Sequence, residues 1–421
     1  MTEAAERHEA LTERLREAAA AAEHVLDAFA RVPRHLFLPG VSLDAAYTDD
    51  AIVTRDEGGV PTSSSSQPSL MARMLAQLDV RAGQRVLEVG AGTGYNAALL
   101  AELGAAVTTV ELQPEVAAAA REHLTAAGVA AAGDRGHGLA AAAAETREAR
   151  ASTAGDPGHG LAAAGEVLVI TGDGAAPPGG PYDRIIVTAA CWSLSAALVG
   201  ALAEGGVLVA PLRVNGVELV LGLRRERDVL RGSGAVPCGF MPLRGGEERP
   251  WRWELGSGGT ATADADLGVE GRGALDRLLA TPGRPIEDPL ALREGEHALD
   301  GLLWLGLQGD PLLSLVLPRE DGRPPWTVGL DVLPASLLVI ELGPTYGKVG
   351  SARLHGGDGA LRTCTSGMAT WRAAGSPGPA ALEITVEPCD DRTGWSLPFG
   401  ASDGAATMVR GAHRWTLRYA A

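Results

Sequence analysis

The chain of 421 residues contains a single lysine, Lys348, so 35 of its 36 basic side chains are arginines. Acidic side chains number 52, which gives a formal net charge of −16 at pH 7. Proteins that bind DNA or RNA neutralise the phosphate backbone with lysine and arginine, and an acidic surface repels that backbone. The charge balance therefore argues against nucleic acid as the partner.

Other features that the sequence lacks exclude further classes of protein. The four cysteines (Cys191, Cys238, Cys364 and Cys389) form no CxxC pair, and the nine histidines show no metal-ligand spacing. Neither a zinc site nor a disulfide framework is indicated. No apolar run is long enough to span a bilayer, and residues 1–31 are charged and alanine-rich. We expect a cytoplasmic protein without a metal or a membrane partner.

The most informative stretch is a glycine-rich loop between an apolar strand and a helix-prone run. It reads Glu88-Val89-Gly90-Ala91-Gly92-Thr93-Gly94-Tyr95-Asn96. Glycine lacks a Cβ and tolerates positive φ, so such a loop can approach a ligand closely. Glu111 ends the next strand-like run, and an acid at this place can bind two ribose hydroxyls. The pattern predicts an S-adenosylmethionine site; the alternative is a tight strand-to-helix turn without a ligand.

Strands and helices alternate through the first half of the chain. The expected strands are 85–90, 106–111, 166–171, 183–188, 206–211 and 217–223, and the expected helices are 95–104, 114–127 and 193–203. Apolar strands separated by helices predict a mainly parallel sheet covered on both faces. The predicted fold class is α/β: a Rossmann-like domain that binds S-adenosylmethionine, followed by an α+β accessory domain.

Two helices are expected before this region. One covers residues 3–31 and carries apolar side chains that include Leu11, Leu15 and Phe29 on one face. A loop-rich segment follows to about Ser66. Another helix begins near Pro68, because proline suits the first turn of a helix.

One segment is a near repeat. Residues 133–140 recur almost unchanged as residues 155–162, at a spacing of 22 residues. Two copies do not make a solenoid. We interpret the stretch of about 131–165 as a surface insertion that arose by tandem duplication; the alternative is a second helical lobe over the cofactor.

The pattern changes after Arg244. Residues 246–421 hold most of the eight tryptophans and many Gly and Pro breaks. Helices are expected at 268–280 and 296–306, and strands at 312–317, 336–342, 382–387 and 413–419. We therefore expect two domains, 1–245 and 246–421, and the second contains no catalytic motif.

Seven motifs along residues 31–245 occur in the order of the protein-L-isoaspartate O-methyltransferase family, which the chain resembles. They are Arg31–Pro39 (RVPRHLFLP), Ala46–Asp49 (AYTD), Ser64–Pro68 (SSSQP), the glycine loop at 87–96, Thr171–Gly174 (TGDG), Pro181–Ala190 (PYDRIIVTAA) and Val236–Arg244 (VPCGFMPLR). The resemblance implies a carboxyl O-methyltransferase that converts S-adenosylmethionine to S-adenosylhomocysteine. It covers a little over half of the chain.

The chain departs from that family in its run of four serines, Ser63–Ser66, its duplicated segment and its extra domain. In these it resembles the long actinobacterial homologues that modify ribosomally synthesised peptides such as lanthipeptides. Those enzymes esterify an aspartate, and the ester cyclises to an aspartimide that can open to isoaspartate. The implied partner is a cyclised precursor peptide. The alternatives are repair of isoaspartate in damaged proteins and, more remotely, a non-catalytic binding module.

The resemblance also assigns roles on the acceptor side of the site. Ser66 aligns with the family's catalytic serine, and Ser65 stands beside it. Asp49 is expected near the acceptor, and Thr188 and Ala189 line it. Each has a structural alternative: a helix N-cap for Ser66, a salt bridge for Asp49 and a buried strand end for Thr188.

On the cofactor side, the residues fall into groups by the part of the cofactor they would meet. The methionine part is assigned to Gly90, Ala91, Gly92, Thr93, Gly94 and Asn96, with Glu88 near its amino group; the ribose to Glu111 and Leu112; the adenine to Gly172, Asp173 and Gly174. The alternatives are an ion pair of Glu88 with Arg85 and a simple Asp-Gly turn at Asp173.

Overall fold

The computed structural model describes residues 2–18, 21–57, 60–133, 166–214, 216–245, 251–264, 266–308, 312–317, 327–343, 347–390 and 405–419. It divides into two compact units. Unit 1 comprises residues 1–211, 220–230 and 238–247, and unit 2 comprises residues 212–219, 231–237 and 248–421. The domain boundary at residue 245 stays a prediction. Most of the duplicated segment, residues 134–165, lies outside the part of the chain that the structure describes.

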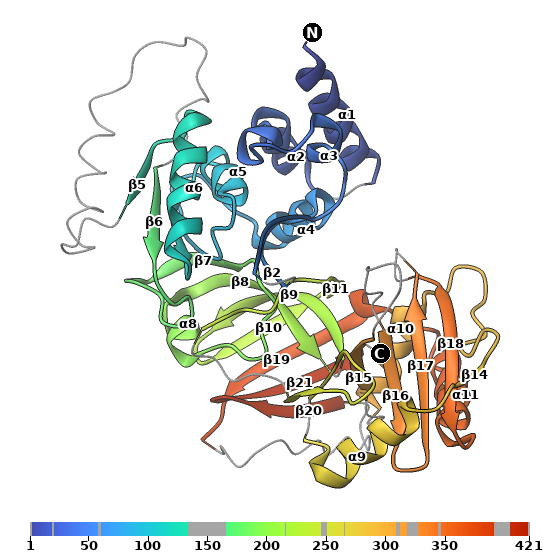
Figure 1. Cartoon of the computed structure of the whole chain (residues 1–421). Coiled ribbons are helices and arrows are strands. Elements are labelled where there is room, and N and C mark those ends of the chain that lie inside the picture. The colour runs from blue at the N-terminus through green and yellow to red at the C-terminus, as the bar shows by residue number, and fades with distance from the viewer. Residues whose placement is uncertain are drawn as a thin grey trace, which may run out of the picture. The chain divides into compact units, whose positions relative to one another are not determined.

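Unit 1 is built on a parallel sheet (Figure 1). Its strands are β3 (Arg85–Val89), β4 (Ala106–Glu111), β5 (Ala131–Gly133), β6 (Val167–Thr171), β7 (Tyr182–Val187) and β8 (Leu202–Val214). They lie in the order β8-β7-β3-β4-β6-β5, and each neighbouring pair is parallel. The successive residues Val86 and Leu87 are both fully buried, so both faces of β3 are covered. The predicted α/β fold is confirmed.

Four helices of unit 1 are interspersed with the strands of this sheet along the chain. They are α4 (Pro68–Leu78), α5 (Tyr95–Glu102), α6 (Pro114–Ala126) and α8 (Ala196–Gly200). The helices α5 and α6 pack on β4 and β6, whereas α4 packs on β7. The helix predicted at 193–203 is wrong beyond α8, because Leu202 already pairs with Tyr182 as the start of β8.

The N-terminal helix predicted at 3–31 is two helices, α1 (Glu3–Glu17) and α2 (Glu23–Arg31). They fold back on each other, because the Nε2 atom of His8 lies 2.6 Å from the carbonyl oxygen of Phe29. In one continuous helix, residues 21 apart would be separated by roughly 30 Å. The short helices η1 (Arg34–Phe37) and α3 (Leu43–Ala46) follow.

The segment expected to be loop-rich contains a hairpin. Its strands are β1 (Ile52–Glu57) and β2 (Val60–Ser65), which pair in antiparallel fashion as a separate two-stranded sheet. The serine run therefore lies largely in a strand, with Ser65 opposite Ile52.

Three strands contain residues of both units: β8, β9 (Val217–Glu226) and β10 (Val229–Ser233). The two-residue strand β11 (Val236–Pro237) belongs to unit 2. The chain therefore passes more than once between the two units.

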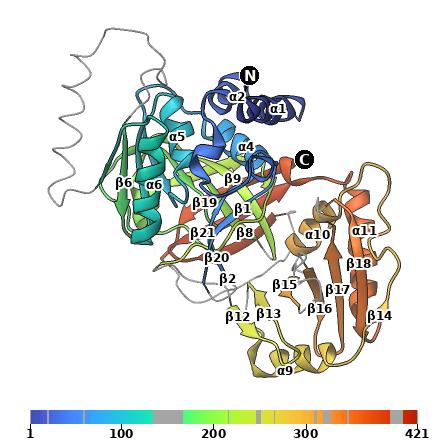
Figure 2. The same ribbon diagram turned by 45° about the horizontal axis from the view of Figure 1, so that its top comes forward.

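Unit 2 is an α+β structure with a seven-stranded antiparallel sheet (Figure 2). In spatial order the strands are β12 (Trp251–Glu254), β13 (Thr260–Ala263), β15 (Leu312–Val316), β16 (Thr327–Val332), β17 (Ser336–Leu342), β18 (Val349–Gly356) and β14 (Arg284–Pro285). Its helices are α9 (Gly268–Leu279), α10 (Ala298–Leu307), α11 (Gly359–Ala373) and η2 (Pro379–Ala381). The strands β19 (Leu382–Pro388), β21 (His413–Tyr419) and β20 (Ala405–Arg410) form an antiparallel ladder.

Both faces of this seven-stranded sheet are covered. On β17, Leu337 and Val339 join a buried cluster with Leu275 of α9. Successive strand residues point to opposite faces, so Leu338 and Ile340 point away from that cluster, and they are also fully buried. The sequence predicted α9, α10, β15, β17, β19 and β21, but not α11 or the remaining strands.

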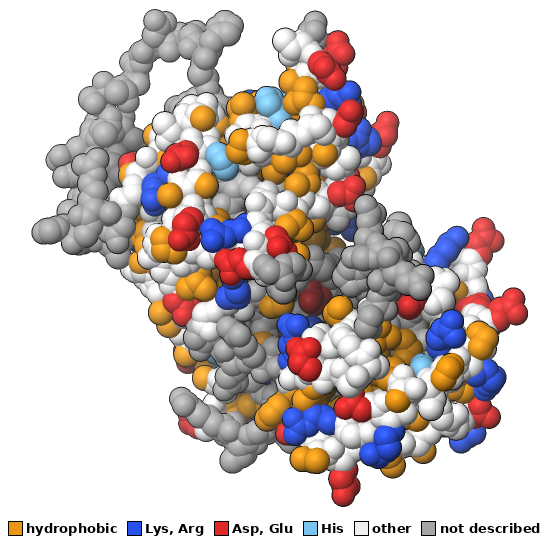
Figure 3. All heavy atoms as spheres, in the orientation of Figure 1, with side chains coloured by type: hydrophobic (Ala, Val, Ile, Leu, Met, Phe, Trp, Pro, Cys, Tyr) orange, Lys and Arg blue, Asp and Glu red, His pale blue; other side chains and the backbone are white. Residues whose placement is uncertain are grey.

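Charged side chains of both signs lie on the surface of the described residues (Figure 3). On the face drawn in Figure 3, acidic and basic side chains lie among each other over unit 2, which is typical of a solvated surface. Among the described residues, no helix is both long and apolar enough to cross a membrane.

Candidate active site

Four parallel strands of unit 1 bring the predicted site segments to one edge of the sheet. In the order β7-β3-β4-β6, each strand ends at or directly before one of them. The segments are Thr188–Ala189, Gly90–Gly94, Glu111–Leu112 and Gly172–Gly174. Parallel strands have their carboxyl ends at the same edge, and open α/β sheets bind ligands there. The chain leaves β3 for β4 on one side and returns as β7 on the other, so β3 marks the switch point.

The glycine loop is folded tightly against two other segments. Gly90 and Gly92 have φ values of 97° and 51°, which favour glycine. A Cβ on Gly90 would lie 2.6 Å from the hydroxyl oxygen of Thr188. A Cβ on Gly92 would lie 3.2 Å from the carbonyl oxygen of Ser64. Side chains at these positions would therefore push the loop away from β7 and β2.

Glu111 ties the glycine loop to the start of α6. Its Oε2 atom accepts a hydrogen bond from the backbone N–H of Gly92 (3.2 Å), and Oε1 accepts one from Gln113 (3.1 Å). The residue is only 8% exposed. Each carboxylate oxygen has two acceptor sites, so these bonds are compatible with the ribose contact, which stays a prediction.

Glu88 is fully buried below the loop. Its Oε1 atom accepts a hydrogen bond from the Asn96 amide (2.8 Å), and Oε2 accepts one from the Thr109 hydroxyl (2.6 Å). Burial raises the pKa of Glu88 to about 7, although both hydrogen bonds act to lower it. Arg85 lies over the ring of Tyr182 instead, and no ion pair with Glu88 occurs in the described part of the chain.

Asp173 begins a turn at the end of β6. Its Oδ1 atom accepts a hydrogen bond from the backbone N–H of Ala175 (2.9 Å), as expected for an Asp-Gly turn. A Cβ on Gly174 would lie 2.1 Å from Cγ1 of Val89, so the turn packs directly on β3. A Cβ on Gly245 would lie 2.6 Å from Oδ1 of Asp173. The closing motif thus ends beside Asp173, whose adenine contact stays a prediction.

The serine-rich strand β2 is fastened to the same edge. The carbonyl oxygen of Thr62 accepts hydrogen bonds from the Gln113 amide (3.0 Å) and from the Arg244 guanidinium (2.8 Å). Gln113 lies two residues after Glu111, the acid that would bind the ribose, and Arg244 ends the closing motif. One backbone oxygen therefore joins the acceptor strand, the ribose side and the closing motif.

The two predicted acceptor serines lie at the end of β2. Ser65 is buried and Ser66 is half-buried. The N-cap of α4 is Gln67, so the alternative of an N-cap role for Ser66 is wrong. Asp49 stabilises this helix start instead, because its carboxylate accepts hydrogen bonds from the Ser69 N–H (2.8 Å) and the Gln67 amide (3.2 Å).

Thr188 connects the acceptor side to the glycine loop. Its hydroxyl donates a hydrogen bond to the carbonyl oxygen of Gly90 (2.7 Å). Ala189 is half-buried, and both backbone groups of Ala190 bond to the closing motif, residues 236–244. Lining of the acceptor site by Thr188 and Ala189 stays a prediction.

Arg34 is a residue that sequence reasoning missed. It is fully buried, and its guanidinium donates to the carbonyl oxygens of Thr48 (2.9 Å), Asp50 (2.9 Å) and Ser66 (3.0 Å). It therefore joins the AYTD segment to the serine strand. Its place in the first of the seven motifs was the only signal in the sequence, because its partners lie 12 to 32 residues away.

Comparison with known families now decides the family. The protein-L-isoaspartate(D-aspartate) O-methyltransferase family matches residues 6–248, more than half of the chain. The chain belongs to this family. A protein-L-isoaspartate O-methyltransferase of Methanoculleus marisnigri is 35% identical over 256 residues, which cover 59% of this chain and 96% of the relative. One of Roseiflexus castenholzii is 33% identical over 226 residues, with coverages of 53% and 85%.

Two solved structures of such enzymes are also similar to this methyltransferase. One protein-L-isoaspartate O-methyltransferase has a TM-score of 0.46 at 20% identity and covers 90% of this chain and 96% of its own. A Plasmodium falciparum protein described as a putative member, in complex with S-adenosyl-L-homocysteine, has a TM-score of 0.40 at 18% identity, with coverages of 56% and 98%.

The methyl donor of this methyltransferase is S-adenosylmethionine, and buried polar atoms at the sheet edge fit such a ligand. Within the described residues, Asn96 Oδ1, Thr62 Oγ1 and Gln113 Oε1 are buried without a hydrogen-bond partner. Buried polar atoms are nearly always satisfied, so these three suit a polar ligand or water. The glycine loop and Glu111 would hold the cofactor. When bound, it supplies a methyl group on a positively charged sulfur.

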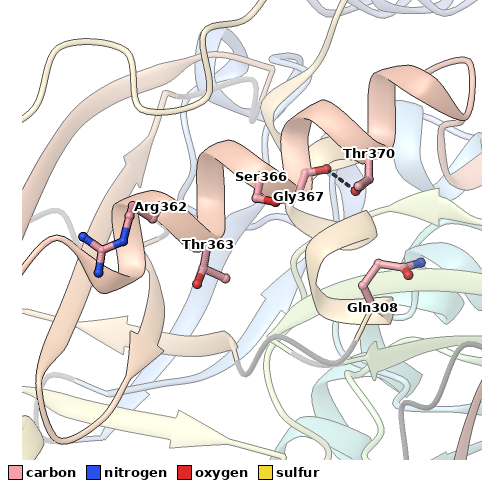
Figure 4. Close-up of a pocket in the computed structure, with 6 residues that line it drawn as sticks. All are labelled: Gln308, Arg362, Thr363, Ser366, Gly367 and Thr370. Atoms are coloured by element: carbon pink, nitrogen blue, oxygen red, sulfur yellow. Dashed lines mark hydrogen bonds between the residues drawn. The ribbon is translucent and has the colours of Figure 1, made fainter.

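Unit 2 contains a separate shallow pocket of about 480 Å³ (Figure 4). It is lined by Gln308, Arg362, Thr363, Ser366, Gly367 and Thr370. All but the first belong to α11, and none is a predicted site residue. The described residues contain no group of three or more His, Cys, Asp or Glu arranged to hold a metal ion.

Proposed function

We propose that the chain transfers a methyl group from S-adenosylmethionine to the carboxylate of an aspartate or isoaspartate in a peptide or protein. The observation that carries the proposal is the contact of the serine strand with the glycine loop, where a Cβ on Gly92 would lie 3.2 Å from the Ser64 carbonyl oxygen. It supports an acceptor site made of hydroxyl groups beside a cofactor site.

This chemistry requires orientation more than acid–base catalysis. A carboxyl group with an ordinary pKa of about 4 is already ionised at neutral pH. A carboxylate oxygen then forms a bond to the methyl carbon while the carbon–sulfur bond breaks and leaves its electron pair on sulfur. Holding reacting atoms in line and excluding water can contribute roughly 7–11 kcal/mol.

The proposed roles follow from the kinds of group present. The hydroxyls of Ser66 and Ser65 orient the acceptor carboxylate, and Thr188 and Ala189 line its other side. Neutral donors hold a carboxylate without the strong ground-state stabilisation that direct contact with a cation would give. Asp49 supports this arrangement through the start of α4.

The finer proposal is that the acceptor is an aspartate of a cyclised, ribosomally made peptide. The family match ends at residue 248, whereas most of unit 2 lies beyond it. We assign this additional unit to recognition of a dedicated peptide substrate. After esterification, the next backbone amide nitrogen would attack the ester carbon, methanol would leave, and an aspartimide would form.

Repair of isoaspartyl residues in damaged proteins is the second candidate function. It is supported by relatives named protein-L-isoaspartate O-methyltransferase, one of which aligns over 96% of its length. Such an enzyme accepts isoaspartate in any flexible segment, whereas a peptide-maturation enzyme acts on one normal aspartate.

The test is a methyl-transfer assay with S-adenosylmethionine, read by mass spectrometry. It compares a generic isoaspartyl peptide with a cyclised peptide that carries a normal aspartate. If a precursor peptide is encoded beside the gene of this protein, its cyclised product is used. One outcome supports peptide maturation: the cyclised peptide alone gains a methyl group and then loses methanol, so that it ends one water below its starting mass. Methylation of the isoaspartyl peptide alone supports repair, and no transfer to either contradicts both.

A further inference from the structure

Arg34 places a buried positive charge directly behind the serine strand. The residue has 0% exposure. Its Nη2 atom donates to the carbonyl oxygens of Asp50 (2.9 Å) and Ser66 (3.0 Å), and both oxygens of Ser65 lie 3.4 Å from it. Its Nη1 atom donates to two carbonyls of the AYTD segment at 2.9 and 3.2 Å. One side chain therefore fixes the backbone of both acceptor serines.

The charge of Arg34 is stabilised by dipoles rather than by an ion pair. Its hydrogen-bond acceptors in the described structure are backbone carbonyls and one serine hydroxyl. The carboxylates of Asp49 and Asp50 act on it only through space. Burial lowers the pKa of the guanidinium, but arginine remains protonated in proteins. A buried charge of this kind projects a stronger field than one in water.

The terminal donors of Arg34 are already used, and its Nε–H is buried without a hydrogen-bond partner in the described structure. Both terminal nitrogens bond to the segments around the acceptor serines, so the guanidinium is not free to grip a substrate carboxylate. It can act on the acceptor in two other ways: by setting the position of the serine hydroxyls, and by making the local potential positive.

We infer that Arg34 is a positioning residue for methyl transfer, which fixes the Ser65–Ser66 backbone and favours an anionic acceptor over a neutral one. The inference rests on the proposed function. A charge held behind the strand attracts the carboxylate to the site, while the lack of direct contact avoids the ground-state stabilisation that would oppose transfer. This reconciles an acidic acceptor with a site whose direct contacts are neutral hydroxyls.

Arg184 is a matched control within unit 1. It is also an inward arginine, 7% exposed, whose guanidinium donates to backbone carbonyls of Leu78 (2.6 Å) and Asp79 (3.0 Å). It stands near the start of β7, whereas the site follows the end of that strand. Loss of the guanidinium hydrogen bonds of Arg184 should affect local packing but not the acceptor site.

The experiment compares the full-length wild type with Arg34→Lys, Arg34→Gln and the control Arg184→Lys. Four quantities are measured: melting temperature, affinity for S-adenosylhomocysteine, kcat and KM for the peptide that the wild type methylates, and inhibition by the same peptide with asparagine at the acceptor position. The ratio of affinities for the acid and amide peptides reports the charge. The value of kcat reports the geometry.

Lysine keeps the charge but has only three donors on a single nitrogen, so Arg34→Lys should lower kcat at least tenfold and keep the acid-to-amide ratio within about threefold. Arg34→Gln should lower both kcat and the ratio. Affinity for S-adenosylhomocysteine should change less than twofold in either variant, and Arg184→Lys should match the wild type in kcat and ratio.

The inference is overturned if folded Arg34→Lys has the kcat and KM of Arg184→Lys, or if its cofactor affinity falls in the same proportion as its turnover. It is also overturned if Arg34→Lys unfolds where Arg184→Lys folds, because Arg34 would then serve stability alone. An inactive wild type would instead contradict the proposed function.

Discussion

The buried carboxyl of Glu88 should make cofactor binding depend on pH. Burial raises the pKa of this group to about 7. If the ionised carboxylate meets the methionine amino group, binding must deprotonate Glu88 in the acidic range. Two perturbations test this: a change of pH from 5.5 to 7.0, and the substitution Glu88→Gln. The pH range lies below the ordinary pKa of an α-amino group, about 7.7–8.0, so the amino group of the ligand stays charged throughout.

The magnitude follows from the titration curve. With a pKa of about 7, roughly 3% of Glu88 is ionised at pH 5.5 and about half at pH 7.0, so affinity should rise roughly 15-fold. Stability should change in the opposite direction. A folded-state pKa raised from 4.5 to about 7 contributes stability that is complete below pH 4.5 and lost as the pH rises through 7. The loss is about 3 kcal/mol.

The assay is calorimetric titration with S-adenosylhomocysteine at several pH values in that range. Glu88→Gln should give an affinity independent of pH. The control is Glu102→Gln, because the Glu102 side chain is only 3% exposed and pairs with Arg31 rather than approaching the glycine loop. This variant should keep the wild-type pH profile. A wild-type affinity that changes less than twofold, or an equal slope in Glu88→Gln, would refute the reasoning.

Three other outcomes test the remaining parts of the structure. Ser66→Ala should lower kcat for the peptide while calorimetric affinity for S-adenosylhomocysteine stays within twofold; loss of that affinity alone would contradict an acceptor role. Gly90→Ala should weaken cofactor binding and destabilise the fold by about 1–2 kcal/mol through its positive φ, and the clash of the new methyl group with Thr188 adds to this. When Thr188→Ala is combined with Gly90→Ala, part of the lost free energy of unfolding should be recovered in denaturant titrations. No recovery would exclude the clash. Asp264→Asn breaks the buried 2.7 Å ion pair with Arg410 and should lower the free energy of unfolding by about 3–5 kcal/mol without changing cofactor affinity.

The parallel sheet could be predicted because its signals are local. The strand expected at 106–111 is β4, residue for residue, since an apolar run between helical segments needs no distant information. The break between α1 and α2 and the extent of α8 could not be placed, because they depend on contacts such as that of His8 with Phe29. The helix α11 was missed because its two glycines and three threonines have poor helix propensity; burial of Trp371 stabilises it instead.

The acceptor site shows the same limit. Resemblance selected Ser65 and Ser66, but a run of serines reads as a loop in any local pattern. It forms a strand because β1 pairs with it and because Gln113 and Arg244 bond to Thr62 from 51 and 182 residues away. Arg34 was not identified for the same reason: its importance lies entirely in partners that the sequence places elsewhere.

The way the two units share the chain constrains how such a protein can be recombined. The chain passes between them five times, after residues 211, 219, 230, 237 and 247. In the first shared segment, Arg213 accepts a hydrogen bond at its carbonyl from Arg410, and a Cβ on Gly216 would lie 3.1 Å from Leu312. A chimaera with a single crossover near residue 245 would separate these partners. Grafting unit 2 onto a shorter relative would therefore require residues 212–219 and 231–237 to be transplanted with it, so the two units are coupled at two places along the gene.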